Sequence, residues 1–198
     1  PSGDLAGKKN YKVQVVGTPG SFTYTFTAPA NNNGDTVTAY TAISTPDSRT
    51  GTISQSGSGT ITLTGLSPNT TYVFRVYATN NYGNSVYSSP STSITTPLAT
   101  TSISLSLPGN VLSVAYGTAT TISATIVGTN GKVTFFLNSK RIGGCLNRPT
   151  NSLVATCTWR PAVHGQAIIS AVFTPTSNAY FSSNTSRIYS VIKRDNLR

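Results

Sequence analysis

The sequence predicts an all-β fold arranged as two β-sandwiches in tandem. Short runs that alternate apolar and polar residues, or are rich in β-branched and aromatic residues, recur along the chain, and helical periodicity is absent. Clusters of Gly, Pro, Asn and Asp separate these runs at short, regular spacing, as in sandwiches of short strands. The length of 198 residues is compatible with two domains.

Six strands are expected in the first half of the chain. They are Tyr11 to Val16, Ser21 to Thr27, Thr36 to Ser44, Gly59 to Thr64, Thr71 to Thr79 and Ser91 to Thr96. The segment Ser54 to Gly59 is rich in Gly and Ser but lacks the Lys and the following helix of a phosphate-binding loop. We therefore predict a flexible hairpin turn there.

Seven strands are expected in the second half. They are Ser102 to Leu107, Val111 to Ala115, Thr120 to Val127, Lys132 to Leu137, Ser152 to Trp159, Gln166 to Thr174 and Arg187 to Ile192. A short Thr-rich joint, Thr95 to Thr101, contains Pro97 and connects the halves. The predicted organisation is an N-terminal extension at 1–10, a first sandwich at 11–97, a second at 98–194 and a tail at 195–198.

The composition excludes most carboxylate chemistry. The chain has no Glu, and its four acidic residues are Asp4, Asp35, Asp47 and Asp195. A glycosidase pair, a calcium site and a two-metal site each need several carboxylates, so none of these is expected. With 26 Ser, 33 Thr and 16 Asn, hydroxyl and amide groups supply the polar surface.

No catalytic, metal or cofactor site is predicted. The single histidine, His164, cannot form a histidine metal cluster, and it has no acid near it in sequence to complete a serine nucleophile. No apolar run approaches the roughly 20 residues of a membrane-spanning helix. The chain begins at Pro1 without a Met and without a leader, which is typical of a processed product or an excised fragment. We expect a protein that is not an enzyme.

The run from Leu63 to Asn80, LTGLSPNTTYVFRVYATN, resembles fibronectin type III domains, and Gly83 and the Ser-rich stretch through Thr96 also fit. The resemblance implies that Tyr72 is a tyrosine corner, whose hydroxyl bonds to upstream backbone. It also implies that Phe26 fills the place of a core tryptophan. No Arg-Gly-Asp motif is present, so integrin-type recognition is not implied.

The second half resembles the bacterial immunoglobulin-like repeats of large secreted surface proteins. The similar segments are Tyr116 to Gly117, Gly131 to Asn138, Lys140 to Cys145, Ala155 to Cys157 and His164 to Gly165. The two resemblances together imply tandem immunoglobulin-like β-sandwiches.

In such repeats two cysteines commonly bridge neighbouring strands, which implies a disulfide between Cys145 and Cys157. The even cysteine count in a chain of extracellular character agrees. A redox pair would need a Cys-x-x-Cys spacing, and zinc would need four ligands. Closing this loop should contribute about 3 kcal/mol to stability.

Basic residues gather around the cysteine loop. Lys140, Arg141, Arg148 and Arg160 flank it, and Trp159 lies between them in sequence. An aromatic ring beside guanidinium groups suits a sugar, phosphate or sulfate, so these five residues form a candidate anion or glycan contact. The opposing interpretation is that Trp159, two residues after Cys157, faces the core.

The formal net charge of +10 favours anionic partners. The cations are scattered and belong to no nucleic-acid motif, so acidic glycan or an anionic cell surface is a more natural partner than specific nucleic acid. A solvated surface that merely lacks Glu is the simplest alternative.

We expect a non-catalytic extracellular structural or adhesion module at the cell surface, a spacer or assembly unit of a bacterial surface protein or filament. Its partners would be other copies of itself or neighbouring domains. Two alternatives remain: a phage virion decoration that binds host glycans, at the virion surface, and an accessory glycan-binding module of a secreted polysaccharide-degrading enzyme.

Overall fold

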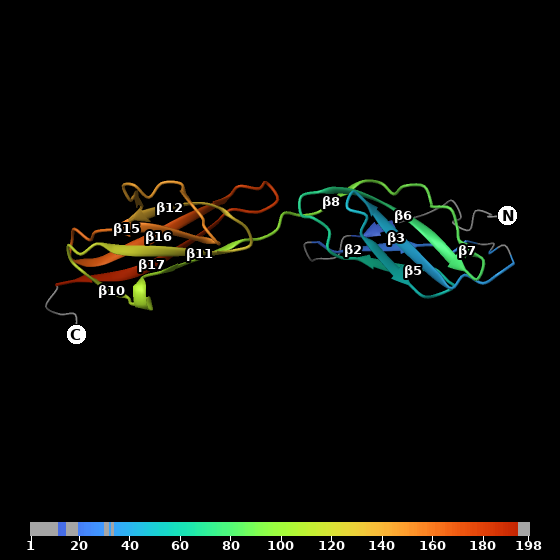
Figure 1. Ribbon diagram of the computed structural model, residues 1–198, viewed down its shortest axis with the longest axis horizontal. Coiled ribbons are helices and arrows are strands. Elements are labelled where there is room, and N and C mark those ends of the chain that lie inside the picture. Colours follow the sequence, from blue (N-terminus) through green and yellow to red (C-terminus); the bar gives the residue numbers. More distant parts are fainter. Residues whose placement is uncertain (1–11, 15–19, 30–31, 33, 194–198) are drawn as a thin grey trace. The chain divides into compact units, whose positions relative to one another are not determined.

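The chain folds into two compact units, Pro1–Leu98 (unit 1) and Ala99–Arg198 (unit 2), shown in Figure 1 as a computed structural model. The structure describes residues 12–14, 20–29, 32 and 34–193. The predicted extension 1–10 and tail 195–198 lie outside the described residues, as do residues 11, 15 and 16 of the strand predicted at 11–16. Apart from one short 3₁₀ helix, every described element is a strand, which confirms the all-β prediction.

Unit 1 is a sandwich of two antiparallel sheets. One sheet has the order β1-β2-β5, and the other has the order β4-β3-β6-β7, with β8 paired to β6. The strands are β1 (Lys12–Gln14), β2 (Phe22–Phe26), β3 (Ala39–Thr45), β4 (Thr50–Ile53), β5 (Gly59–Leu63), β6 (Thr71–Asn80), β7 (Gly83–Asn84) and β8 (Ile94–Thr95).

The core of unit 1 comes from alternate residues of facing strands. Phe22, Tyr24 and Phe26 of β2 are all buried, and Phe74 of β6 packs edge-on against Phe22 with ring centroids 5.8 Å apart. The ring of Phe26 lies 4.3 Å from that of Tyr40. Phe26 therefore fills core volume as an aromatic side chain.

The segment 54–58 crosses from one sheet to the other, so the predicted hairpin is wrong. The strand before it, β4, pairs with β3, whereas the strand after it, β5, pairs with β2. The side-chain amide of Gln55 bonds the Gly57 and Ser58 carbonyls and thereby organises the crossing. Gly51 in β4 allows close approach, because a Cβ there would overlap the Thr62 carbonyl of β5.

Three serines run along β6 in place of a regular strand, and we call Ser85, Ser88 and Ser91 the serine ladder. Each serine N–H donates to the carbonyl of one β6 residue at 2.8 Å, and each serine Oγ accepts the N–H of that same residue at 3.0 Å. The pairs are Ser85 with Ala78, Ser88 with Val76 and Ser91 with Phe74. The serines are spaced by three residues and their partners by two, so the ladder does not follow a regular strand register. The strand predicted at 91–96 is shorter in the structure, where β8 covers Ile94–Thr95.

Unit 2 is also a sandwich of two sheets. A three-stranded sheet has the order β15-β11-β9, and a six-stranded sheet has the order β10-β17-β16-β12-β13, with β14 paired to β12. The strands are β9 (Ser102–Ser106), β10 (Ser113–Ala115), β11 (Thr120–Val127), β12 (Gly131–Leu137), β13 (Lys140–Arg141), β14 (Arg148–Pro149), β15 (Val154–Trp159), β16 (Gly165–Pro175) and β17 (Ser183–Ile192).

The chain changes sheets between β9 and β10. β9 pairs antiparallel with β11, and β10 pairs parallel with β17 in the opposite sheet. The turn between them is the 3₁₀ helix Pro108–Asn110, in which Gly109 has a φ of 68°. A glycine tolerates this left-handed conformation at little cost, so it suits the crossing.

The core of unit 2 lies between these sheets. Inward residues alternate along β11, β12 and β16, with Ile122, Phe135 and Ile169 fully buried. Trp159 at the end of β15 belongs to the same core and is only 4% exposed. The tryptophan therefore has the core position that its spacing from Cys157 suggests.

Candidate functional site

The disulfide of unit 2 joins Cys145 to Cys157, as the sequence predicted, with Cα atoms 5.4 Å apart. Cys157 lies in β15, at the edge of the three-stranded sheet. Cys145 follows β13, and its carbonyl accepts a hydrogen bond from Phe135 of β12 in the six-stranded sheet. The bond thus links the two sheets rather than neighbouring strands, because the cysteine loop leaves one sheet and returns in the other.

Tyr72 in unit 1 is fully buried, and its hydroxyl makes two hydrogen bonds. It accepts the N–H of Ser67 at 2.8 Å and donates to Oδ2 of Asp47. The Ser67 hydroxyl donates to the same carboxylate oxygen at 3.0 Å. The hydrogen bond from Tyr72, and then that from Ser67, hold the pKa of Asp47 below its usual value, because both stabilise the ionised carboxylate.

Asp47 was not singled out by sequence reasoning. It lies 25 positions before Tyr72, and no local pattern connects a loop aspartate with a later strand. Thr96 was also missed: it is buried, and its hydroxyl donates to the Ser67 carbonyl at 2.6 Å while accepting the N–H of Thr70 at 2.9 Å. These bonds attach the start of β6 to the last residues of unit 1.

The basic residues of the candidate contact in unit 2 do not converge on one point. The Arg148 Nε donates to the Thr156 carbonyl at 3.1 Å, and the Arg160 guanidinium donates to the Gly117 carbonyl at 2.7 Å. Lys140 and Arg141 form β13 and are exposed. His164 stacks on Tyr116 with ring centroids 4.3 Å apart, and Tyr116 precedes the Gly117 that accepts from Arg160.

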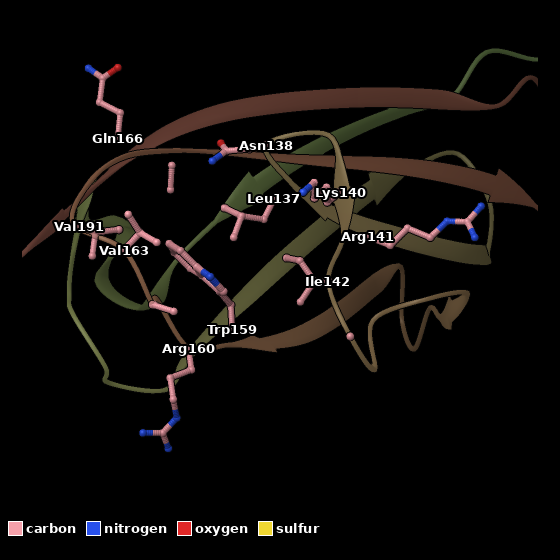
Figure 2. Close-up of a pocket in the computed structure, with 13 residues that line it drawn as sticks. Leu137, Asn138, Lys140, Arg141, Ile142, Trp159, Arg160, Val163, Gln166 and Val191 are labelled. Carbon is pink, nitrogen blue, oxygen red and sulfur yellow. The ribbon is translucent and has the colours of Figure 1, made fainter.

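Four of the five predicted contact residues nevertheless line one cavity. Its volume is about 470 Å³. Its walls come from three places: the segment from the end of β12 to β13, the end of β15 with the residues after it, and the start of β16 beside the end of β17. Lys140, Arg141, Trp159 and Arg160 contribute to its wall, and Arg148 does not. Figure 2 shows the Trp159 ring among Leu137, Ile142 and Val163.

The buried position of Trp159 changes what the cavity can do. At 4% exposure its ring face is not available as a flat platform on which a sugar could stack. The walls are largely aliphatic and come from residues that sequence reasoning did not select, among them Leu137, Ile142 and Val163. The strand alternation places Leu137 on the inner face, but it does not show that space remains beside it.

The described parts of the chain contain no group of three or more His, Cys, Asp or Glu side chains arranged to hold a metal ion. Within the same residues, no helix has the length and apolar character needed to cross a bilayer.

Unit 1 belongs to a known class of β-sandwich module. Residues 6–94 match the model of the fibronectin type III domain. The first half of the chain is therefore a fibronectin type III domain, a kind of module that is generally non-catalytic. No curated protein matches the chain.

Several solved structures of tandem modules are similar to this chain in fold. A two-domain fibronectin type III segment of chicken tenascin is 15% identical with a TM-score of 0.50, over 92% of this chain and 98% of that one. The fibronectin(III)-like modules of Clostridium thermocellum CbhA are 17% identical, with a TM-score of 0.38 over 96% and 97%. The FN1–FN3 domains of chicken CNTN1 are 14% identical with a TM-score of 0.43; the match covers 92% of this chain and spans only 65% of that relative.

Proposed function

We propose that the chain is a non-catalytic extracellular module pair, a spacer or assembly unit of a bacterial surface protein or filament. In this proposal unit 2 is a bacterial immunoglobulin-like repeat that follows the fibronectin type III domain. The observation that carries the proposal is the inter-sheet disulfide of unit 2, which lies beside a core separate from that of unit 1.

The disulfide supports an oxidising location. Structural disulfides persist outside the cytosol, where thiols are not kept reduced. Both cysteines are at most 3% exposed, so a reductant reaches the bond poorly while the sandwich is folded. A bond in this position protects a module that must stay folded outside the cell.

The separate cores support a role as a spacer. Each unit encloses its own apolar cluster, and each is a compact body by itself. Modules of this kind extend a larger protein without needing a shared core. The hydroxyl-rich surface keeps such a module hydrated with few charges.

The test is antibody labelling of intact source cells, with permeabilised cells as the comparison. The proposal predicts labelling of intact cells and cysteines that resist alkylation until a reductant is added. Labelling only after permeabilisation, or free thiols in the native protein, would contradict it. Sedimentation velocity of the purified chain then separates a spacer from an assembly unit. A spacer stays monomeric, whereas an assembly unit forms larger species as its concentration rises.

The cavity favours a second candidate, an accessory ligand-binding module of a larger secreted protein. In that case the basic wall of unit 2 would contact an anionic ligand directly. Binding by the isolated chain, with no tendency to assemble, would favour this candidate over the structural role.

A further inference from the structure

The cavity of unit 2 has walls suited to an apolar group. Leu137, Ile142, Val163 and Val191 are among its lining residues. Leu137 and Ile142 are only partly buried although both pack against the core. Its volume of about 470 Å³ lies within the range of small-molecule sites, about 300–1,000 Å³. An aliphatic chain or a small ring would gain free energy by leaving water for this space.

The rim of the same cavity is positively charged. Lys140, Arg141 and Arg160 contribute to its lining and are exposed. In Figure 2 the ends of Arg141 and Arg160 point away from the aliphatic side chains. The bond from Arg160 to the Gly117 carbonyl uses one of the five guanidinium donors and holds that cation near the opening.

No acidic side chain opposes these cations among the described residues of unit 2. The sequence from 99 to 193 contains seven Lys and Arg residues and no Asp or Glu. An anion that approaches the rim therefore meets attraction without a compensating carboxylate from residues 99–193. A cationic ligand of the same shape would be repelled.

We propose that this cavity binds a small amphiphilic anion, with its apolar part between the sheets and its charged group at the rim. The charge must stay at the rim because a buried anion without a partner is strongly unfavourable. This ligand class replaces a stacked sugar, since the Trp159 ring is buried and the walls are aliphatic. The binding role goes beyond the structural role proposed above and does not depend on it.

The experiment uses Trp159 as its reporter. It is the single tryptophan of the chain and lines the cavity, so a ligand that enters should change its fluorescence. The intact chain is titrated with octanoate below its micelle concentration, with octylammonium and octanol as matched probes and dextran sulfate as a hydrophilic polyanion. Octanoate should give a saturable change that weakens with salt. Octylammonium and dextran sulfate should give none, and octanol should bind more weakly than octanoate.

Two variants, each with a matched control, locate the binding. Val163→Asp places a carboxylate in the cavity wall and should weaken octanoate binding about tenfold or more, because like charges meet there. Val127→Asp is the matched control, since Val127 is also exposed, lies in the same unit and is absent from the cavity lining. Arg141→Gln should weaken binding and Lys132→Gln, outside the lining, should not.

Several results would overturn the proposal. These are the lack of a saturable octanoate signal, equal binding of octanoate and octylammonium, or unchanged affinity in Val163→Asp. If dextran sulfate alone produces the signal, the basic surface binds hydrophilic polyanions and the apolar cavity has no part in it, which also contradicts the proposal.

Discussion

The two units use different kinds of bond to hold the segments of their sandwiches together. In unit 1, hydrogen bonds of hydroxyl groups hold the segments flanking β6: the Tyr72, Ser67 and Asp47 cluster and the serine ladder. In unit 2, the covalent bond between Cys145 and Cys157 ties the two sheets together. Similar folds can thus depend on different solution conditions, since one closure responds to protonation and the other to reduction.

The largest expected difference follows from removing the disulfide. Replacing both cysteines, Cys145→Ala with Cys157→Ala, should lower the free energy of unfolding of unit 2 by about 3 kcal/mol, because the unfolded chain gains freedom. Trp159 fluorescence during urea unfolding reports unit 2 alone. The urea midpoint of unit 1, followed by the amide signals of β6 residues, should not change. An unchanged Trp159 midpoint would show that the inter-sheet bond is dispensable.

The next effect concerns Tyr72. Tyr72→Phe removes the acceptor of the Ser67 N–H and the donor to Asp47, and should cost unit 1 about 1–3 kcal/mol. The control is Tyr82→Phe, because that side chain is 88% exposed. Urea unfolding followed by the amide signals of unit 1 measures both variants. Equal midpoints for the two would mean that the hydrogen bonds of the Tyr72 hydroxyl do not stabilise the unit.

A smaller effect is expected from the serine ladder. Ser88→Ala removes the side-chain acceptor of the buried Val76 N–H and should cost about 1 kcal/mol. Its neighbour Ser89 is exposed, so Ser89→Ala serves as the control. The same unfolding measurement applies. If both variants unfold like the wild type, the backbone bonds of the ladder suffice without the hydroxyl groups.

The smallest effect comes from acid. The pKa of Asp47 is lowered on folding, so near and below pH 3.8 the folded unit binds fewer protons than the unfolded chain. The contribution of Asp47 to the free energy of unfolding is complete above its ordinary pKa of 3.8. It is lost as the pH falls below 3.8 toward the pKa in the folded unit. Asp47→Asn should flatten the acid dependence of unit 1 in urea unfolding. The idea fails if the variant and the wild type lose stability in parallel.

The sequence predicted the sandwich fold because alternation reports which strand face is buried. Tyr72, Phe74 and Val76 alternate, and each is buried in β6. Pairing partners are less accessible from sequence, since they depend on which sheet a strand joins. The short strand β4, Thr-Gly-Thr-Ile, has little apolar character and no predicted strand covers it, whereas the Gly- and Ser-rich segment after it predicts a hairpin turn.

The candidate site was only partly predictable. The spacing of Trp159 from Cys157 allowed the core position that the structure shows, and the two cysteines were paired correctly. The cavity beside Trp159 depends on how completely side chains from five strands and their connections fill the end of the sandwich, which no local pattern encodes. The three-residue spacing of Ser85, Ser88 and Ser91 was a visible signal of the ladder, but it matches neither a strand nor a helix.

Hydrogen exchange of the intact chain, with and without a thiol reductant under mildly destabilising urea, tests the central comparison most directly. Peptides from the two sheets of unit 2, covering β12 and β15, should lose protection on reduction, because the inter-sheet bond is gone. Peptides covering β6 in unit 1 should exchange at the same rate in both conditions. Equal loss of protection in β6 and β15, or no change in β15, would contradict the account of two independently closed units.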